Sequence, residues 1–249
     1  MESMPMVPTH PMSSQQPDMS FSPNAKQAIV FFDFDNTITF FDILDDIIKR
    51  FSINQDWLRF EEDWSSGRIG SKECLEGQLK SVRVTKQTLS EYLSTIELDP
   101  FFDKLLALFK KSGVEFVIVS DSFYFIIKEI LRHNGIRGVK VYANNVKFRG
   151  DELIPSFPYA SKDCTRCAHC KKKHVLEHKD KKTIYIGDGL SDICPAQESD
   201  MVFAKENLLD HLRKTQTPCV AFRNLGDVYK YFGTLDGTKP KVKKVLAAV

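Results

Sequence analysis

The sequence AIVFF at Ala28–Phe32 is followed at once by DFDNT at Asp33–Thr37. The first five residues are all apolar and mostly β-branched or aromatic, with no polar alternation. Such a run is typical of a strand buried on both faces of a parallel sheet. In open α/β sheets, ligands bind outside the carboxyl ends of the strands. The two aspartates of DFDNT therefore lie where such a fold would place a site.

Further runs of the same kind follow along the chain. Phe116–Val119 and Thr183–Ile186 are each followed by polar residues and then by a helical pattern, which indicates βα units. Met201–Ala204 and Cys219–Phe222 are weaker candidates for a fourth and a fifth strand. The expected fold class is α/β: a Rossmann-like parallel sheet flanked by helices.

Two smaller units are expected within this frame. Apolar residues at helical spacing between the first two strands predict a small inserted helical cap over residues 43–105. The α/β core would then comprise residues 28–42 and 106–236. Short extended pieces in Val139–Pro158, interrupted at Gly150-Asp151, predict a β-hairpin flap.

The two ends of the chain differ from this core in composition. Residues 1–27 are rich in Pro, Ser, Met and Gln and cannot bury enough apolar surface to offset the entropy of ordering, which predicts a disordered tail. Residues 237–249 form a short basic tail, for which a solvated surface segment is expected and no function is assigned.

Composition excludes several classes of protein. The 249 residues, 42% of them hydrophobic, are enough for one ample domain with an insert. A formal charge of +2 gives no surface suited to nucleic acid, and no apolar run approaches the roughly 20 residues of a membrane span. Six cysteines without a disulfide pattern favour the reducing cytoplasm. The sequence leaves the oligomeric state open.

Polar residues follow each of the three strongest strands. Besides Asp33 and Asp35, the second strand ends in Ser120-Asp121 and the third is followed by Gly187–Asp192, GDGLSD. A single aspartate after a strand is more often a helix N-cap than a ligand. Three such groups at one sheet edge would repel one another and require a cation, for which an oxygen-seeking ion such as Mg²⁺ is suited.

These motifs resemble those of haloacid dehalogenase superfamily phosphatases, which share an aspartate pair, a serine, a lysine opening a helix, and GDGLSD in this order. The resemblance implies a magnesium-dependent phosphomonoester hydrolase with an aspartyl-phosphate intermediate. It assigns a role to each matching residue. Asp33 would be the nucleophile and Asp35 the general acid and base. Ser120 and Lys171 would bind the phosphate, with Lys172 as the alternative lysine. Asp33, the Asp35 carbonyl and Asp188 would bind Mg²⁺, and Asp192 would orient water or the lysine.

A narrower resemblance is to phosphoethanolamine and phosphocholine phosphatases, whose relatives include a pyridoxal phosphate phosphatase. It rests on Ser120-Asp121, on the segment Cys164–Lys171 and on the segment Gly187–Pro195. The family's cysteines are more widely spaced, and its acidic pair aligns here only with a one-residue gap. The resemblance implies that a cationic headgroup is bound by Asp45 and Asp121, with Asp42 as a further candidate. Pyridoxal phosphate or another small metabolite is the alternative substrate, and a catalytically silent phosphoester-binding or scaffolding module is the alternative of another class.

A cysteine cluster precedes the predicted lysine. Cys164, Cys167, Cys170 and His174 offer three thiolates and an imidazole, a donor set for tetrahedral Zn²⁺. Plain thiols that position the lysine loop are the alternative, and an iron-sulfur cluster would need a remote fourth donor. His169 is expected to be exposed. Trp57 and Trp64, two helical turns apart, are expected in the cap core, with an aromatic cage for choline as the alternative.

Overall fold

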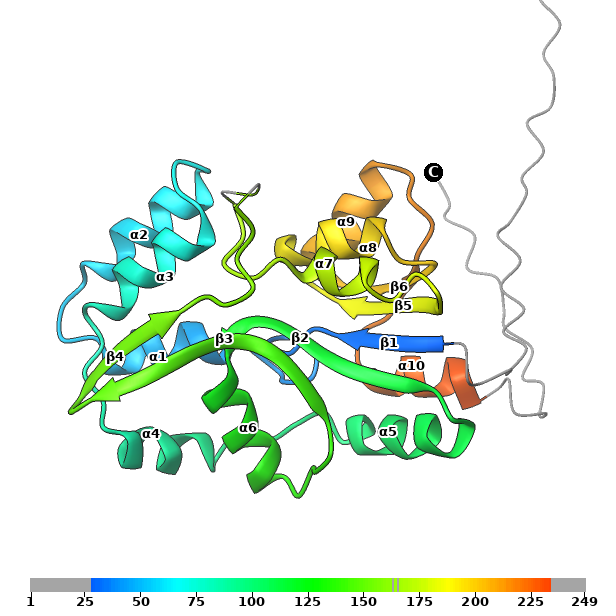
Figure 1. Cartoon of the computed structure of the whole chain (residues 1–249), viewed down its shortest axis with the longest axis horizontal. Helices are drawn as coiled ribbons and strands as arrows, with labels where there is room; N and C mark the ends of the chain where they lie inside the picture. The colour runs from blue at the N-terminus through cyan, green and yellow to red at the C-terminus, as the bar shows by residue number, and fades with distance from the viewer. Residues whose placement is uncertain (1–27, 163, 165, 234–249) are drawn as a thin grey trace, which may run out of the picture.

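The computed structural model describes residues 28–162, 164 and 166–233, so the predicted tails at 1–27 and 237–249 lie outside the described residues. A seven-stranded sheet with the order β4-β3-β2-β1-β5-β6-β7 forms its centre (Figure 1). Its parallel strands are β1 (Ala28–Phe32), β2 (Glu115–Phe123), β3 (Lys140–Arg149), β5 (Lys182–Gly187), β6 (Met201–Ala204) and β7 (Val220–Ala221). The α/β class and all five predicted strands are confirmed.

Helices cover both faces of the sheet because its central strands are apolar on both sides. Val30 and Phe32 of β1 belong to one hydrophobic cluster with residues of α5 (Phe101–Ser112), α6 (Tyr124–His133) and α10 (Leu225–Gly233). Ile29 and Phe31 belong to a second cluster with residues of α7 (Lys171–Leu176), α8 (Ile193–Gln197) and α9 (Glu206–Lys214). Figure 1 shows α5 and α6 on the side of the sheet opposite α7, α8 and α9.

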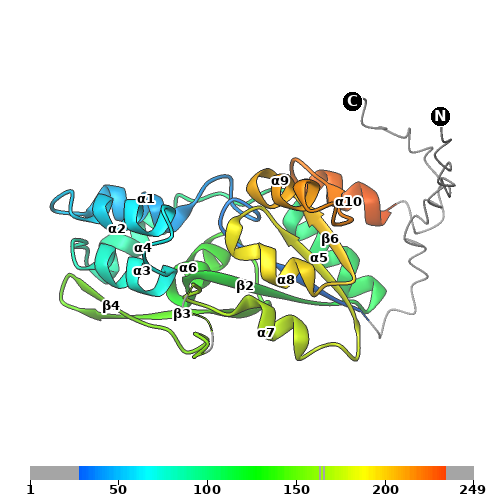
Figure 2. The same cartoon turned by 90° about the horizontal axis from the view of Figure 1, so that it is seen from above.

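Four helices between β1 and α5 lie at one end of the sheet (Figure 2). They are α1 (Ile43–Phe51), α2 (Trp57–Ser65), α3 (Ser71–Leu79) and α4 (Lys86–Leu93). Asp42 caps α1 by accepting a hydrogen bond from the Asp45 N–H at 2.9 Å. The boundary placed at residues 105/106 from the sequence falls inside α5, which packs against β2 and α10.

The hairpin predicted over residues 139–158 is present and reaches the cap helices. β3 pairs antiparallel with β4 (Glu152–Ser156), and Gly150 at the turn has a φ of 64°, a left-handed conformation that glycine adopts without steric cost. At the turn the Val84 N–H donates to the Asp151 carbonyl at 2.8 Å, and next to it Arg83 forms a β-bridge with Glu152. The hairpin therefore packs against the cap.

No described helix could cross a lipid bilayer. The longest of them, α5, has 12 residues, whereas a span needs about 20.

Candidate active site

The carboxyl ends of β1, β2 and β5 bring the predicted acidic residues to one edge of the sheet. The Asp33 N–H donates to the Ile186 carbonyl of β5 at 2.9 Å, which continues the β1 ladder and fixes the first aspartate beside the third strand. Asp33, Ser120 and Asp188 are all buried and line one pocket of about 320 Å³ between this edge and the cap. The sheet topology thus places these three strand ends at one site.

Lys171 lies at the centre of this site. Its Nζ donates to Asp33 Oδ1 at 2.7 Å, to Asp192 Oδ1 at 2.8 Å and to Ser191 Oγ at 3.0 Å, so all three ammonium hydrogens are used. Burial alone would lower the pKa of Lys171, but Asp192 and Asp33 outweigh it and hold the pKa well above its ordinary value. Lys172, the alternative, is half-exposed and pairs with Glu198 at 2.6 Å. Lys171 is therefore the lysine that contacts the predicted nucleophile.

Asp192 is fully buried, and hydrogen bonds occupy both of its oxygens. Oδ1 also accepts from the Tyr185 hydroxyl at 2.6 Å, and Oδ2 accepts from the N–H groups of Asp188 and Gly189, both at 3.0 Å. A Cβ at Gly187 would lie 2.5 Å from Asp192 Oδ2, so only glycine allows this approach. Because its oxygens are taken, Asp192 orients the lysine and the loop rather than offering a free ligand atom.

Asp33 and Asp188 offer the oxygens that could hold a metal ion. Together with Asp192 they place one carboxylate oxygen each within 4.8 Å of one another. Thr37 donates to Asp188 Oδ1 at 2.7 Å and fixes its orientation. Burial and the nearby Asp192 raise the pKa of Asp188 to about 7, and the same two causes raise that of Asp33 well above its ordinary value. Two buried carboxylates that disfavour their own charge fit a hard divalent cation such as Mg²⁺.

Asp35 connects the site to the cap. Its Oδ1 accepts a hydrogen bond from the N–H of Ile43, the first residue of α1, at 2.9 Å. Burial, with Asp42 next in effect, raises the pKa of Asp35 well above its ordinary value. A carboxyl group whose pKa is raised holds its proton to a higher pH than usual, which suits it to donate that proton to a leaving group.

The cap wall of the pocket is acidic. Asp42, Asp45 and Glu61 line it, whereas Lys171 is the one basic side chain among the lining residues that the structure describes. Buried Gln78 donates from Nε2 to Glu61 Oε2 at 2.9 Å. Burial raises the pKa of Glu61, and the nearby Asp45 raises it further.

Trp64 corrects one expectation from the sequence. The residue was expected in the cap core, but α2 buries none of its side chains, and half-buried Trp64 lines the pocket. Its Nε1 donates to Ser71 Oγ at 3.0 Å. The N–H of Ser71 in turn donates to the Arg166 carbonyl at 2.9 Å, which links the cap to the loop before Lys171. Trp57 is partly buried and packs against the main hydrophobic cluster.

The end of β2 contributes three successive polar residues to the pocket. Ser120 is buried, and its Oγ accepts from the Ser122 N–H at 3.0 Å. Burial raises the pKa of Asp121, whose Oδ1 has no hydrogen-bond partner within the described parts of the chain. Of the three residues predicted to bind a headgroup, Asp42 and Asp45 thus lie on the cap side and Asp121 on the core side.

The four predicted zinc ligands do not come together in one cluster, although the Cys164 and Cys167 side chains are hydrogen-bonded to each other. Among the described residues, the metal-ligating group found is that of the aspartates, and Cys164, Cys167, Cys170 and His174 do not form another. His174 is engaged elsewhere: its Nε2 lies 2.7 Å from His169 Nε2, and its ring stacks on Tyr142 with centroids 4.2 Å apart.

The expectation that His169 is exposed is wrong. His169 is 1% exposed and His174 3%, because the loop folds back so that the two rings pack against each other and against aromatic neighbours. Burial lowers the pKa of His169 to about 3 and that of His174 to about 4, so both rings are neutral at physiological pH.

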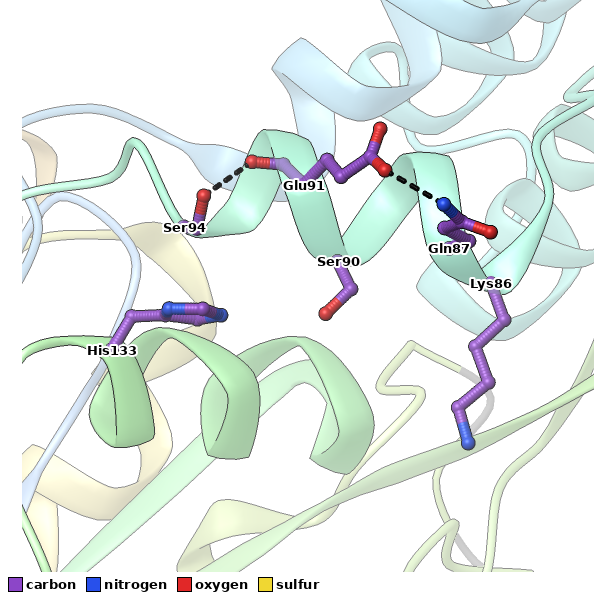
Figure 3. Close-up of a pocket in the computed structure, with 6 residues that line it drawn as sticks. All are labelled: Lys86, Gln87, Ser90, Glu91, Ser94 and His133. Atoms are coloured by element: carbon purple, nitrogen blue, oxygen red, sulfur yellow. Dashed lines mark hydrogen bonds between the residues drawn. The ribbon is translucent and has the colours of Figure 1, made fainter.

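A second pocket, between α4 and α6, is larger at about 550 Å³ but lacks this chemistry (Figure 3). Glu91 is held there by neighbours on its own helix: its side chain accepts from Gln87 Nε2 at 3.0 Å and its carbonyl from Ser94 Oγ at 2.6 Å. The residues lining it are Lys86, Gln87, Ser90, Glu91, Ser94 and His133. Only one of these residues is a carboxylate, so this pocket lacks a cluster of acidic side chains like the one at the sheet edge.

Some site residues were missed from the sequence. Thr37 lies within the DFDNT motif and could have been found there, and Ser191 lies within GDGLSD. Tyr185 has a hydroxyl group and lies between two isoleucines in a buried strand, a pattern that indicates a partner for its hydroxyl. Glu61 and Gln78, from two cap helices, are 17 residues apart, and no local pattern joins them.

Comparisons with known proteins agree with this fold and site. The model of the family described as "Putative Phosphatase" matches residues 28–221, so the chain belongs to that family. The solved structures it resembles include a phospho-aspartyl intermediate analogue of phosphoserine phosphatase (TM-score 0.64, 16% identity, covering 83% of this chain and 99% of that one). Phosphoserine phosphatase from T. onnurineus gives a TM-score of 0.63 at 15% identity, covering 86% and 98%. At these identities the likeness shows a shared fold.

Curated relatives point to the same class of enzyme. The 2-hydroxy-3-keto-5-methylthiopentenyl-1-phosphate phosphatase of Brevibacillus brevis is 27% identical over 213 residues, which cover 83% of this chain and 95% of the relative. The enzyme of the same name from Geobacillus kaustophilus is 28% identical over 210 residues, covering 82% and 94%. The chain is therefore a haloacid dehalogenase-type phosphatase, a phosphoric monoester hydrolase. These names differ from the narrower phosphoethanolamine and phosphocholine family expected from the sequence.

Proposed function

We propose that this phosphatase is Mg²⁺-dependent, acts through an aspartyl-phosphate on Asp33, and hydrolyses a small phosphomonoester with a cationic headgroup, phosphoethanolamine or phosphocholine. The observation that supports the chemistry is the 2.7 Å contact between Asp33 and buried Lys171, next to Asp188. Every acidic residue that the phosphatase motifs require is present in this chain, which argues against a catalytically silent module.

The reaction divides into two transfers. The Asp33 carboxylate attacks phosphorus while Asp35 gives its proton to the leaving oxygen, so the ester P–O bond breaks and the alcohol departs. Asp35, now a carboxylate, removes a proton from water, which attacks the aspartyl-phosphate and releases inorganic phosphate. Lys171 and Ser120 stabilise charge on the phosphoryl oxygens. Bound Mg²⁺ would neutralise Asp33 and Asp188 and polarise a phosphoryl oxygen.

The acidic cap wall supports the cationic headgroup. Glu61 and Asp45 of the cap and Asp121 of β2 line the pocket in addition to the carboxylates that the chemistry uses. An ammonium group that leaves water needs an anionic or hydrogen-bonding partner, and a carboxylate provides both. The indole of Trp64 at the same wall adds a π face that attracts cations.

A second candidate substrate is the one named for the curated relatives, 2-hydroxy-3-keto-5-methylthiopentenyl-1-phosphate. One feature of the pocket favours it: Leu44, Leu75 and Leu190 line the wall together with Cys74, and a methylthio group would pack against such side chains. Pyridoxal phosphate is the further alternative, because it too is a small phosphomonoester.

A substrate panel with detection of free phosphate tests the proposal. It compares kcat/KM for phosphoethanolamine, phosphocholine, pyridoxal phosphate, the methylthiopentenyl ester and p-nitrophenyl phosphate. A preference for the two amine esters is expected. A preference of at least tenfold for the methylthiopentenyl ester would replace the headgroup assignment and leave the phosphatase class intact.

Charge-neutralising variants test which carboxylates recognise the headgroup. Glu61→Gln, Asp45→Asn and Asp121→Asn should each lower kcat/KM for phosphoethanolamine by about 10- to 100-fold, since a hydrogen bond to a charged group contributes ~1.5–3 kcal/mol. p-Nitrophenyl phosphate, which has no cationic group, should lose much less. Glu62→Gln is the matched control, because Glu62 adjoins Glu61 but does not line the pocket. Equal losses on both esters would contradict headgroup recognition.

We also place the enzyme in the cytoplasm. All six cysteines are free thiols, which supports a reducing compartment.

A further inference from the structure

Tyr185 of β5 places a buried phenol next to the active site. The residue is fully buried, and its hydroxyl donates to Asp192 Oδ1 at 2.6 Å. Burial, with the charge of Asp192 next in effect, holds the pKa of Tyr185 well above its ordinary value, so the phenol keeps its proton and donates it to the carboxylate oxygen. Phenylalanine has the same ring, so packing accounts for the ring but not for the hydroxyl.

Gly187 allows this phenol to reach Asp192. Residues two apart in a strand face the same side of the sheet. A Cβ at Gly187 would lie 2.9 Å from Tyr185 Cε1 as well as 2.5 Å from Asp192 Oδ2, and both distances are too short for a side-chain carbon. The contact between the ring and the carboxylate therefore depends on the glycine that begins the GDGLSD motif.

The hydroxyl completes the donors around Asp192. An ionised carboxylate has about four acceptor positions, and those of Asp192 are filled by Lys171, Tyr185 and two backbone N–H groups. Three of these donors are neutral and held by the backbone or by a packed ring, so the carboxylate cannot rotate away from the lysine.

This arrangement matters when a phosphoryl group binds at Asp33. Lys171 uses its three hydrogens on Asp33, Ser191 and Asp192, and the phosphoryl oxygens need one of them. Asp192 is the partner that can hold Nζ in place during this exchange. Because Tyr185 shares Oδ1 with the lysine, it offsets part of the Asp192 charge and leaves more of the ammonium charge for the phosphoryl group.

We propose that Tyr185 is a positioning residue for phosphoryl transfer, whose hydroxyl fixes Asp192 Oδ1 and through it holds Lys171 against the phosphoryl oxygens. The inference rests on the proposed roles of Asp33 and Lys171 and is independent of the headgroup. Tyr185 does not touch the substrate, since it is fully buried and does not line the pocket. Its effect should therefore disappear when Lys171 is absent.

Tyr185→Phe removes the hydroxyl and keeps the ring. It should lower kcat/KM about tenfold, as the loss of a hydrogen bond to a charged group does. The loss should be equal for every ester that the wild type hydrolyses, p-nitrophenyl phosphate included, because the phosphoryl group is common to all of them. The Kd of inorganic phosphate, measured by calorimetry with Mg²⁺, should rise several-fold.

Tyr92→Phe is the matched control for stability. Tyr92, in the cap helix α4, also donates to a carboxylate at 2.6 Å, that of Asp46, and neither residue lines the pocket. Both variants should lower the Tm, because each loses a hydrogen bond to a charged group. Tyr92→Phe should leave kcat/KM and the Kd of phosphate unchanged, as a purely structural role of Tyr185 would also do.

The Lys171→Met background tests whether Tyr185 acts through the lysine. There, Tyr185→Phe should change kcat/KM by less than twofold, because the group that it positions is gone. The inference is overturned if Tyr185→Phe alone keeps kcat/KM within twofold of the wild type, if Tyr92→Phe loses as much, or if the double variant falls a further tenfold below Lys171→Met. A wild type that hydrolyses no ester of the panel refutes the proposed function. The Kd of phosphate then decides the inference, since a rise with Tyr185→Phe upholds it and an unchanged Kd overturns it.

Discussion

Replacing Lys171 with methionine removes the one cation that lies between two buried carboxylates. Asp33 and Asp192 lie 2.7 and 2.8 Å from its Nζ, and the lysine side chain is 2% exposed. Methionine has a similar length and preserves the packing, but it leaves both aspartates uncompensated. Breaking a buried ion pair by removing one partner costs about 3–5 kcal/mol, so we expect a loss of this size in the free energy of unfolding.

Urea unfolding in EDTA at 25 °C measures this loss, with Lys172→Met as the matched control. Lys172 is adjacent in the sequence, but its side chain is 42% exposed and pairs with Glu198 at the surface, where solvent screens the ion pair and its loss should change stability little. In assays with Mg²⁺, Lys171→Met should lower kcat/KM about 10²- to 10³-fold, the usual effect of removing one preorganised donor. Lys172→Met should stay close to the wild type.

Adding Asp192→Asn to Lys171→Met separates charge from packing. The amide can turn its oxygen to the N–H groups of Asp188 and Gly189 and its nitrogen to Tyr185, which removes the uncompensated charge and keeps these contacts. The double variant should regain about 1–3 kcal/mol of stability without regaining activity. The reasoning fails if Lys171→Met loses no more stability than Lys172→Met, or if the double variant is less stable than Lys171→Met.

Three further predictions follow from the site and its surroundings. Asp33→Asn should fold normally and hydrolyse no ester, because an amide does not attack phosphorus; turnover above a few per cent of wild type contradicts the nucleophile assignment. Mg²⁺ should raise the Tm of the wild type and restore activity after EDTA, and Asp188→Asn should abolish the Tm shift; full activity in EDTA would contradict the metal site. Burial lowers the pKa of His174 from 6.5 to about 4. As the pH falls, the unfolded chain therefore takes up a proton at His174 at a higher pH than the folded chain does. The free energy of unfolding should decrease between pH 6.5 and pH 4, by up to ~3 kcal/mol. Urea unfolding of His174→Gln should show a shallower decline over this range, and parallel curves would refute the pKa.

Local sequence determined the fold class and the sheet edge that holds the site. A strand buried on both faces must be apolar throughout, so AIVFF at Ala28–Phe32 identifies the central strand without any knowledge of its neighbours. Parallel strands end at the same edge, and therefore Asp33, Ser120 and Asp188 could be assigned to one site from their positions after three strands. Gly150 indicated the hairpin turn for an equally local reason: glycine readily adopts a positive φ, and Gly150 has one.

Tertiary structure decided which side chains meet. Lys171 and Lys172 are equivalent in a sequence that leaves the start of α7 uncertain by one residue, and only packing turned the first toward Asp33, 138 residues away. His169 has no apolar pattern around it, yet the loop folds back and places its Nε2 beside Nε2 of His174. Strand and turn preferences are encoded within a few residues, whereas contacts between distant side chains depend on how the whole chain packs.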